Sequence, residues 1–256
     1  MQHTPESLKN FLDEKVLQYN SPAFIATDPI SIPHLFSRKE DREISGFLAA
    51  TIAWGQRKSI VNNARRLMLL MDDAPLDFVM HFRERDLLRF EGFVHRTFNF
   101  TDLSAFLYSL KNIYQHYGGM ETVFAKGLAK GGMEMAIAGF REVFFEIPHP
   151  IRTRKHVSNP LAGSSAKRLN MFLRWMIRQD SKGVDFGIWP SISPSQLICP
   201  LDVHSGRVAR KLGLLCRRQD DWKAASELTS QLRLLDPHDP VKYDFALFGL
   251  GVFEKF

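Results

Sequence analysis

The chain of 256 residues has only two cysteines, Cys199 and Cys216. Two thiols exclude a disulfide scaffold, a four-thiolate iron–sulfur cluster and a four-cysteine zinc site, so we expect both to be reduced and buried in the core. No stretch approaches the ~18 consecutive apolar residues of a membrane span. The N-terminal segment MQHTPESLKNFLDEK is polar and contains acids, unlike a signal or transit peptide. These absences favour a cytoplasmic protein without membrane contact.

Metal and nucleotide motifs are also missing. The nine histidines include no HxxxH or HxH ligand spacing, and no GxxxxGK or GxGxxG phosphate loop is present. We therefore expect neither a metal nor a cofactor.

What the chain does contain is a helical pattern. Apolar side chains recur at i, i+3, i+4 and i+7 along 44–52, 60–71 and 103–114, with Thr101 and Asp102 as capping candidates for the third helix. Alternating β-branched runs are short and few, so an all-α fold is predicted. Further helices are expected at about 120–128, 133–145, 165–179, 203–212, 222–235 and 240–252.

One third of the chain is strongly basic. Residues 151–219 contain 13 Lys and Arg but only three acids, a local net charge of +10, whereas the whole chain has a net charge of +6. The remainder is therefore acidic, at −4. This asymmetry indicates a polyanionic partner for the basic third, unless it is only a solvated surface.

Asp202 follows a proline-rich loop and directly precedes a helix, which makes it an N-cap candidate. A capping carboxylate accepts backbone N–H bonds at the positive helix end and stays ionised. Taken alone, such an aspartate is usually only a cap.

Lys167 is expected in the first turn of another helix, after a Pro/Gly/Ser turn. The helix dipole disfavours a cation there, so this lysine either binds an anion or is partly deprotonated, as an amine nucleophile must be. An ordinary surface lysine is the alternative.

The segment LDVHSGRVARKLG resembles the helix-hairpin-helix DNA glycosylase superfamily of the endonuclease III type. Its members read Val-Asp-Thr-His-Val-x-Arg-Val-x-x-Arg-Leu-Gly around the catalytic aspartate. The matching positions are Asp202, His204, Arg207, Val208, Leu212 and Gly213. The superfamily hairpin Leu-Pro-Gly-Val-Gly-x-Lys-Thr-Ala-Asn-x-x-Leu is similar to residues 161–173. There Gly163, Lys167, Asn170 and Leu173 match.

The resemblance departs from the superfamily in three ways. Ser164 and Ser165 replace the second glycine region of the hairpin, the C-terminal four-cysteine cluster is absent, and the relatives of this branch are themselves uncharacterised, so the substrate does not transfer. The connection from Lys167 to Asp202 is long. That long connection is similar to archaeal 8-oxoguanine glycosylases. At the level of the whole chain, the segments SAKRLNMFLRWMIR, PLDVHSGRVARKLG and DPVKYDFALFGLGV look most like a bacterial family of uncharacterised proteins distantly related to those glycosylases.

The resemblance implies a two-lobed helical glycosylase fold with a degenerate hairpin. One lobe would be a central bundle, 40–180, carrying the hairpin. The other would combine 1–39 with 181–256 and carry the catalytic aspartate. The implied function is base-excision repair: a monomer would remove an oxidised, 8-oxoguanine-like base from double-stranded DNA. Lys167 would form a Schiff base that permits strand cleavage, and Asp202 would stabilise the charged sugar.

The same resemblance suggests which residues hold the DNA. The phosphates would lie against Gly163, Ser164, Ser165, Arg168, His204 and Arg207. A flipped base would need amide donors and flat stacking surfaces. The candidates are Gln56, Trp54, Trp175 and Trp189, although each tryptophan is more often a core residue.

Two other functions stay open. A non-catalytic nucleic-acid-binding protein could keep the helical scaffold and lose the chemistry, as the degenerate hairpin suggests. A helical adaptor for other proteins would have a fortuitous basic face and no salt-dependent affinity for DNA.

Overall fold

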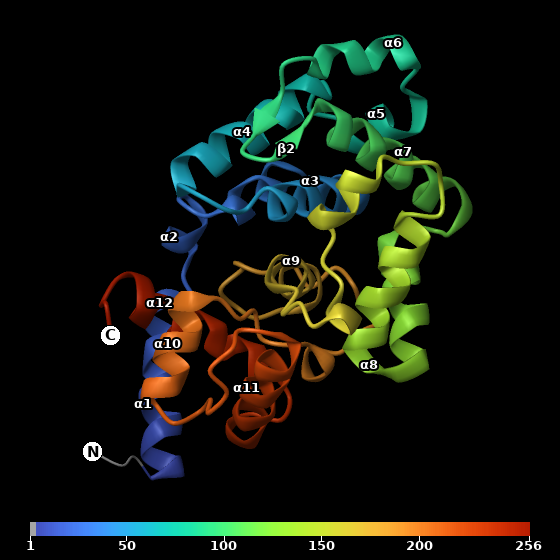
Figure 1. Ribbon diagram of the computed structural model, residues 1–256. Helices are drawn as coiled ribbons and strands as arrows, with labels where there is room; N and C mark the ends of the chain where they lie inside the picture. The colour runs from blue at the N-terminus through green and yellow to red at the C-terminus, as the bar shows by residue number, and fades with distance from the viewer. Residues whose placement is uncertain (1–3) are drawn as a thin grey trace. The chain divides into compact units, whose positions relative to one another are not determined.

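The computed structural model describes residues 4–256 and is built mainly of helices (Figure 1). Within that range the sheet structure is a single hairpin, in which β1 (Val94–His95) pairs antiparallel with β2 (Phe98–Asn99). The predicted all-α class is therefore confirmed. The helices are α1 (Pro5–Tyr19), α2 (Pro22–Ile25), α3 (Lys39–Thr51), α4 (Arg57–Leu70), α5 (Pro75–His81), α6 (Glu84–Leu87), α7 (Phe100–His116), α8 (Met120–Phe144), α9 (Lys167–Ile177), α10 (Val203–Lys211), α11 (Trp222–Leu235) and α12 (Tyr243–Val252).

The chain divides into two compact units. The central unit is Ile25–Asn159, and the terminal unit combines the residues up to Phe24 with Pro160–Phe256. These boundaries differ from those at 39/40 and 180/181 expected from the sequence. The difference matters for α9, which was expected in the central bundle. Its Phe172 packs edge-to-face on Trp189, with ring centroids 5.5 Å apart, so α9 belongs to the terminal unit.

The central unit has a core rich in phenylalanine. Phe106 on α7 contacts Phe47 of α3 and Phe144 of α8, with centroids 5.8 and 4.7 Å apart. Burial of such rings supplies a large apolar area and favours edge and offset geometries. Helix α8 is interrupted at Gly131–Gly132, where Gly132 has a φ of +76°. This interruption matches the two helices predicted at 120–128 and 133–145.

The cap of α7 corrects the sequence prediction. The N-cap is Asn99, whose side chain accepts from the Asp102 N–H, while the Asp102 carboxylate accepts from the Asn99 N–H. Thr101 and Asp102 therefore lie inside the first turn. The reciprocal pair is a capping box, which satisfies two backbone donors at once.

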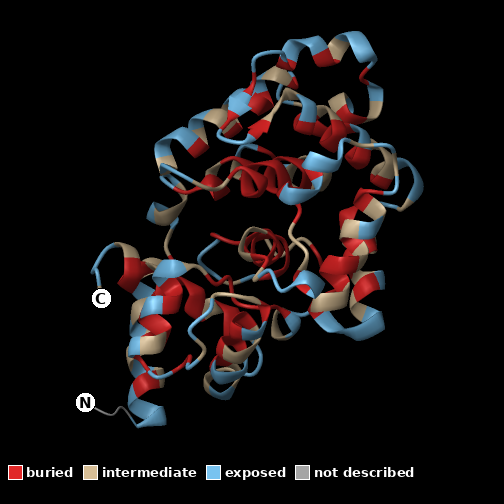
Figure 2. Cartoon of the chain, in the orientation of Figure 1, coloured by how far each residue is buried: buried red, intermediate tan, exposed pale blue. Residues whose placement is uncertain are grey.

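The terminal unit surrounds α9, whose residues from Leu169 to Ile177 are all buried (Figure 2). Helix α12 packs against both α1 and α10. Helix α1 was not predicted. It starts after the N-cap Thr4 and buries Leu8, Leu12 and Val16 along one face.

The two thiols differ in environment. Cys199 is buried, as expected, but Cys216 is exposed, which corrects the prediction of two core thiols. Over residues 4–256, none of the helices is long and apolar enough to cross a membrane.

Candidate active site

Asp202 caps α10 as the sequence predicts. Its Oδ1 accepts hydrogen bonds from the backbone N–H groups of His204 and Ser205, at 2.9 and 3.0 Å. In return, the Asp202 N–H donates to the Ser205 hydroxyl at 3.0 Å. These contacts fix the carboxylate at the helix start, with one oxygen used for capping.

The second carboxylate oxygen faces Lys167. The Nζ atom of Lys167, the first residue of α9, lies 3.5 Å from Asp202 Oδ2. The two side chains are 29% and 28% exposed, so the pair is open to solvent on one side. An amine and a carboxylate separated by 34 residues thus meet at the starts of two helices. Their convergence is what the family resemblance implies, whereas their catalytic roles stay predictions.

The turn before α9 is held in place by several contacts. The Ser165 hydroxyl donates to the carbonyl of Leu201, next to Asp202, at 3.5 Å. The Ser165 carbonyl accepts from the Asn170 side chain at 2.9 Å, and the Gly163 carbonyl accepts from the Trp222 N–H at 3.0 Å. These bonds connect the turn to the chain just before Asp202 and to the start of α11. They account for the alignment of Lys167 with Asp202.

The chain enters this turn through a short helical segment. Pro160–Ala162 forms a three-residue 3-10 turn. Gly163 has a φ of +88°, which glycine adopts without strain. Ala166 precedes α9 at a φ of +50° and makes no side-chain cap, so backbone N–H groups of the first turn can be offered to a ligand.

Charge around Asp202 keeps it ionised. Burial alone would raise the pKa of Asp202, but the Lys167 ammonium and the N–H groups of Ser205 and His204 outweigh it, so the pKa lies below its usual value. The carboxylate is therefore negative at neutral pH, as the stabilisation of a developing cation requires.

A second carboxylate, Asp244 on α12, influences this pair and was missed in the sequence. Its side chain accepts a hydrogen bond from Arg174, which lies on α9 two turns beyond Lys167. Burial raises the pKa of Asp244 to about 6, against the lowering effect of Arg174 and Lys167, while Asp202 raises it further. The sequence signal that could have revealed Asp244 is an acidic residue at the start of the otherwise apolar helix YDFALFGLGV.

Arg174 belongs to a buried ionic network. It also pairs with Asp185 at 3.3 Å, and Arg178 pairs with Asp185 at 3.0 Å and with Asp239 at 2.9 Å. Buried charges need such partners because their desolvation is costly. The network holds the C-terminal half of α9 in place. Because Lys167 is the first residue of the same helix, the network also helps to fix its position.

Comparison with known families adds one match. The DUF2400 family, described as proteins of unknown function, matches residues 28–253. The chain belongs to the DUF2400 family. Neither curated proteins nor solved structures give a match. Lys167 and Asp202 both lie within the matched region.

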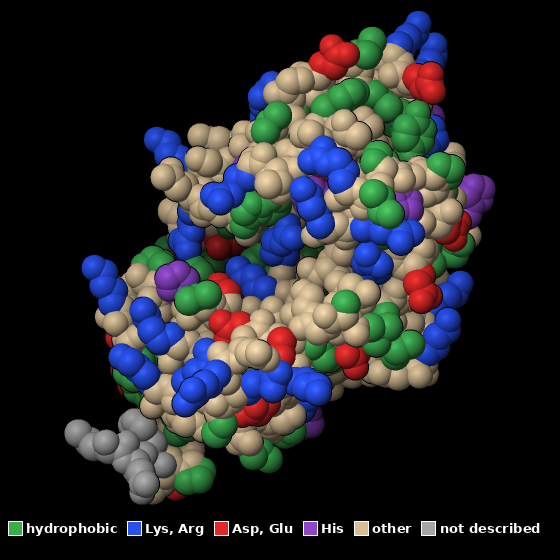
Figure 3. All heavy atoms as spheres, in the orientation of Figure 1, with side chains coloured by type: hydrophobic (Ala, Val, Ile, Leu, Met, Phe, Trp, Pro, Cys, Tyr) green, Lys and Arg blue, Asp and Glu red, His purple; other side chains and the backbone are tan. Residues whose placement is uncertain are grey.

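The predicted phosphate-binding residues of this DUF2400 protein differ in how far they are exposed. Gly163, Ser164, His204 and Arg207 are exposed, and Arg207 donates to the carbonyl of Gly251 at 3.2 Å. Ser165 and Arg168 are half-buried, and burial lowers the pKa of Arg168 to about 10, so it stays a cation at neutral pH. Lys and Arg side chains also lie over α10 and the segment after it (Figure 3).

The predicted base-recognition residues also differ in burial. Trp175 and Trp189 are 0% and 1% exposed, packed in the core of the terminal unit. This corrects the expectation that they offer stacking surfaces, because buried rings cannot receive a base without repacking.

Trp54 and Gln56 lie in the central unit of the DUF2400 chain. Trp54 is half-buried, and its ring contacts those of His95 and His156, with centroids 5.3 and 6.0 Å away. Gln56 is exposed at the start of α4. Their predicted role in base recognition stays a prediction.

Residues 4–256 contain no group of three or more His, Cys, Asp or Glu side chains placed to bind a metal ion. The Lys167–Asp202 pair itself presents an amine and a carboxylate.

Proposed function

We propose that this DUF2400 protein is a DNA glycosylase with AP-lyase activity that removes an oxidised, 8-oxoguanine-like base. The observation that carries the proposal is the 3.5 Å separation of the Lys167 amine and the Asp202 carboxylate at the starts of α9 and α10. Covalent catalysis needs its nucleophile and its acid–base partner within reach of one carbon atom.

The first half of the reaction breaks the glycosidic bond. As the C1′–N bond breaks, its electron pair leaves with the base, which takes up a proton from the Lys167 ammonium and leaves that side chain as a neutral amine. The positive charge that develops on the sugar lies beside ionised Asp202. The Lys167 amine then gives its lone pair to C1′ and passes a proton to the Asp202 carboxylate.

The second half cleaves the strand. The C1′–O4′ bond breaks as protonated Asp202 gives its proton to O4′, and a protonated imine joins Lys167 to the open sugar. The Asp202 carboxylate then accepts a proton from C2′, and the C3′–O bond breaks to expel the 3′ phosphate. Hydrolysis of the imine releases Lys167 and restores the enzyme.

Charge in the same segment supports DNA as the substrate. Residues 151–219, which contain both members of the pair, have a net charge of +10. Such a segment attracts the phosphate backbone through counterion release. The exposed turn at Gly163 and the start of α9 would contact phosphate through backbone N–H groups.

A non-catalytic DNA-binding protein is the second candidate. It is favoured by the degenerate hairpin, in which Ser164 and Ser165 replace the second glycine region. It predicts DNA affinity that does not depend on the Lys167 amine as a nucleophile.

Borohydride trapping separates the two. The protein is incubated with duplexes containing an abasic site or 8-oxoguanine, with borohydride present to reduce an imine to a stable amine. We expect a covalent protein–DNA adduct. Lys167→Arg keeps the cation beside Asp202 but should give no adduct, because a guanidinium forms no imine under these conditions.

The matched control is Lys211→Ala, which removes an exposed cation from the other end of α10. It should leave the adduct in place. DNA binding by wild-type protein with no adduct on either duplex would overturn the proposed enzyme in favour of the second candidate. Equal adduct from Lys167→Arg would show that another amine is the nucleophile.

A further inference from the structure

A two-residue turn joins strands β1 and β2 in the central unit. Its first residue, Arg96, has a φ of +54°, in the left-handed region that L-residues rarely adopt. Two-residue β-hairpin loops need a positive φ at this position, and glycine usually occupies it because it has no Cβ to clash. Arginine is therefore strained where glycine would be relaxed. Such strain indicates a function for the side chain.

The Arg96 side chain lies over the segment between α3 and α4. A Cβ placed on Gly55 would be 3.2 Å from Arg96 Nη1 and 3.3 Å from Arg96 Cδ, so the arginine passes close above this glycine. Both residues are exposed. Within residues 4–256, the Arg96 guanidinium has no carboxylate partner. Its N–H donors therefore remain for a ligand.

A short 3-10 helix, η4 (Ile151–His156), holds the tip of the β-hairpin. The Arg152 guanidinium donates to the Thr97 carbonyl and to the Asn99 side chain, each at 3.0 Å. It also lies 3.3 Å from the carboxylate of Asp102, whose side chain is 0% exposed. Because Thr97 follows Arg96 directly, the tip and η4 belong to one surface.

The exposed charges of this surface are positive. Arg154 and Lys155 of η4 are exposed, and in the described part of the chain neither pairs with a carboxylate. The Arg154 Nε donates instead to the His149 ring, at 2.9 Å. Figure 3 shows Lys and Arg side chains gathered over this part of the central unit. We define the β-hairpin surface by its four cations, Arg96, Arg152, Arg154 and Lys155, which face one buried acid, a formal net charge of +3.

We propose that the β-hairpin surface binds the phosphate backbone of double-stranded DNA. The inference rests on the proposed function for its partner, but not on Lys167 as a nucleophile. A DNA strand offers one phosphate after another, so several separate cations can each contact one, whereas a small anion would meet one or two. Arginine and lysine side chains contact phosphate oxygens without reading the base sequence. The central unit thus has its own contact with DNA.

Fluorescence anisotropy with an undamaged duplex, measured on the full chain over a range of potassium chloride concentrations, tests the proposal. Arg96→Gly and Lys155→Ala should each reduce the slope of log K against log salt by about 0.9, and the double variant by about 1.8. The loss should be equal on two duplexes of unrelated sequence, because phosphate contacts do not depend on sequence. Arg96→Lys keeps the cation and should keep the slope of the wild type.

Thermal melting of Arg96→Gly separates function from stability. Glycine relieves the positive φ, and this relief offsets the greater freedom of glycine in the unfolded chain. The variant should therefore bind DNA more weakly but melt no lower than the wild type. A lower Tm would show that Arg96 stabilises the turn, and it would overturn the functional explanation of the strain.

The matched control is Lys130→Ala, which removes an exposed lysine of the same unit and should leave the slope unchanged. The proposal is overturned if the double variant binds DNA with the slope of the wild type. It is also overturned if Lys130→Ala reduces the slope equally, since the effect would then follow from net charge alone. A third contradicting result is a double variant that loses binding to vesicles of anionic lipid but not to DNA.

Borohydride trapping by the wild type keeps this surface distinct from the proposed enzyme. A wild-type adduct, together with an unchanged slope in the double variant, would overturn the β-hairpin surface alone. A reduced slope in the double variant, with no adduct from the wild type, would support the surface and overturn the enzyme. Absence of DNA binding by the wild type at low salt would overturn the surface whatever the trapping shows.

Discussion

Two substitutions at Asp202 separate its role as a helix cap from its role as a charge. Asparagine and aspartate are similarly good N-caps, so Asp202→Asn keeps an oxygen for the N–H groups of His204 and Ser205. Asp202→Ala removes both the cap and the charge. Only the charge is needed to stabilise a cationic sugar.

The magnitudes follow from the contacts. Loss of the cap in Asp202→Ala should cost about 1 kcal/mol, and up to ~2 kcal/mol, of unfolding free energy. A chain of this size loses about 2–4 °C in Tm per kcal/mol. In Asp202→Asn the main loss is the Lys167 pair. Its members are 28–29% exposed, so the cost should stay below about 1 kcal/mol.

The effect of pH has a definite sign. The pKa of Asp202 is lowered in the folded protein, so its charge stabilises the fold above the unfolded pKa. That contribution is lost as pH falls through the folded pKa. The stability difference between wild type and Asp202→Asn should therefore be constant from pH 7 down to about 5 and shrink below about pH 4.

Urea denaturation and borohydride trapping on the same three proteins give the test. We expect Asp202→Ala to be the less stable variant and both variants to lose the adduct. An Asp202→Asn protein that traps DNA as well as wild type would refute the electrostatic role. An Asp202→Ala protein as stable as Asp202→Asn would refute the capping role.

Three further predictions concern other parts of the terminal unit. Arg174→Ala should lower the unfolding free energy by about 3–5 kcal/mol in urea titrations, because it leaves Asp185 and Asp244 buried without this partner; a loss below about 1 kcal/mol would contradict the buried network. Gly163→Ala should lose about 1 kcal/mol in the same assay, since its φ is +88° and a Cβ there has nothing within 4 Å to pack on; an unchanged midpoint would contradict the strain. Arg207→Ala should weaken DNA binding uniformly across sequences and reduce the slope of log K against log salt by about 0.9 in fluorescence anisotropy; an unchanged slope would mean that Arg207 contacts no phosphate.

Local signals in the sequence predict much of the fold. The apolar stripes of α3, α4 and α7 and the cap at Asp202 depend on residues a few positions apart, so they can be recognised along the chain. The same is true of the interruption of α8 at Gly131–Gly132. Helix α1 could have been found in this way, because Thr4, Pro5 and the spacing of Leu8, Leu12 and Val16 are helix signals.

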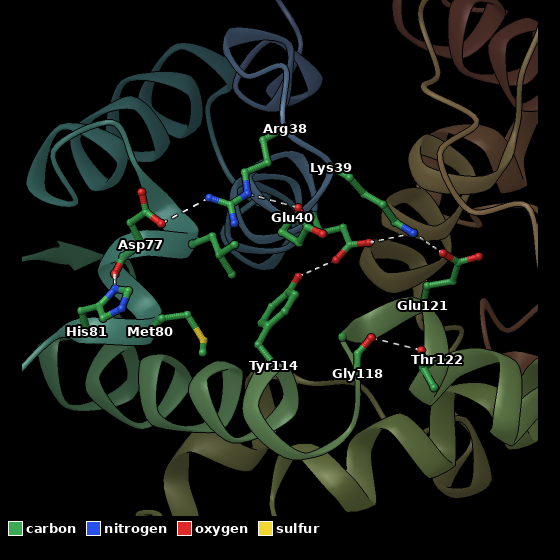
Figure 4. A pocket seen from close by; sticks show the side chains of 13 residues that line it. Arg38, Lys39, Glu40, Asp77, Met80, His81, Tyr114, Gly118, Glu121 and Thr122 are labelled. Atoms are coloured by element: carbon green, nitrogen blue, oxygen red, sulfur yellow. Dashed lines mark hydrogen bonds and ion pairs between the residues drawn. The ribbon is translucent and has the colours of Figure 1, made fainter.

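Tertiary packing decides what the sequence leaves open. A tryptophan can serve as a core residue or as an exposed stacking surface, and the sequence does not distinguish the two. Only the fold shows that Trp175 and Trp189 are buried. Asp244 lies on α12, far from Lys167 in the sequence. Its link to the site depends on Arg174, which lies on α9 two turns beyond Lys167 and donates a hydrogen bond to Asp244. A pocket of the central unit is lined by residues of α3, α5, α7 and α8 (Figure 4), which are far apart along the chain, so no local pattern predicts it.

The pairing of Lys167 with Asp202 was predicted from resemblance to a family and not from their spacing in the sequence. Each alone has an ordinary interpretation, as a surface lysine and as a cap. Their distance depends on the turn contacts of Ser165 with Leu201 and Asn170, which no local pattern predicts.

Peptide mapping of the trapped complex tests the central claim most directly. After borohydride reduction and nuclease digestion, tandem mass spectrometry locates the sugar remnant on the protein. The account predicts the added mass on Lys167 and its loss in Lys167→Arg. A remnant on another lysine or on the N-terminal amine, with Lys167 unmodified, would contradict the account.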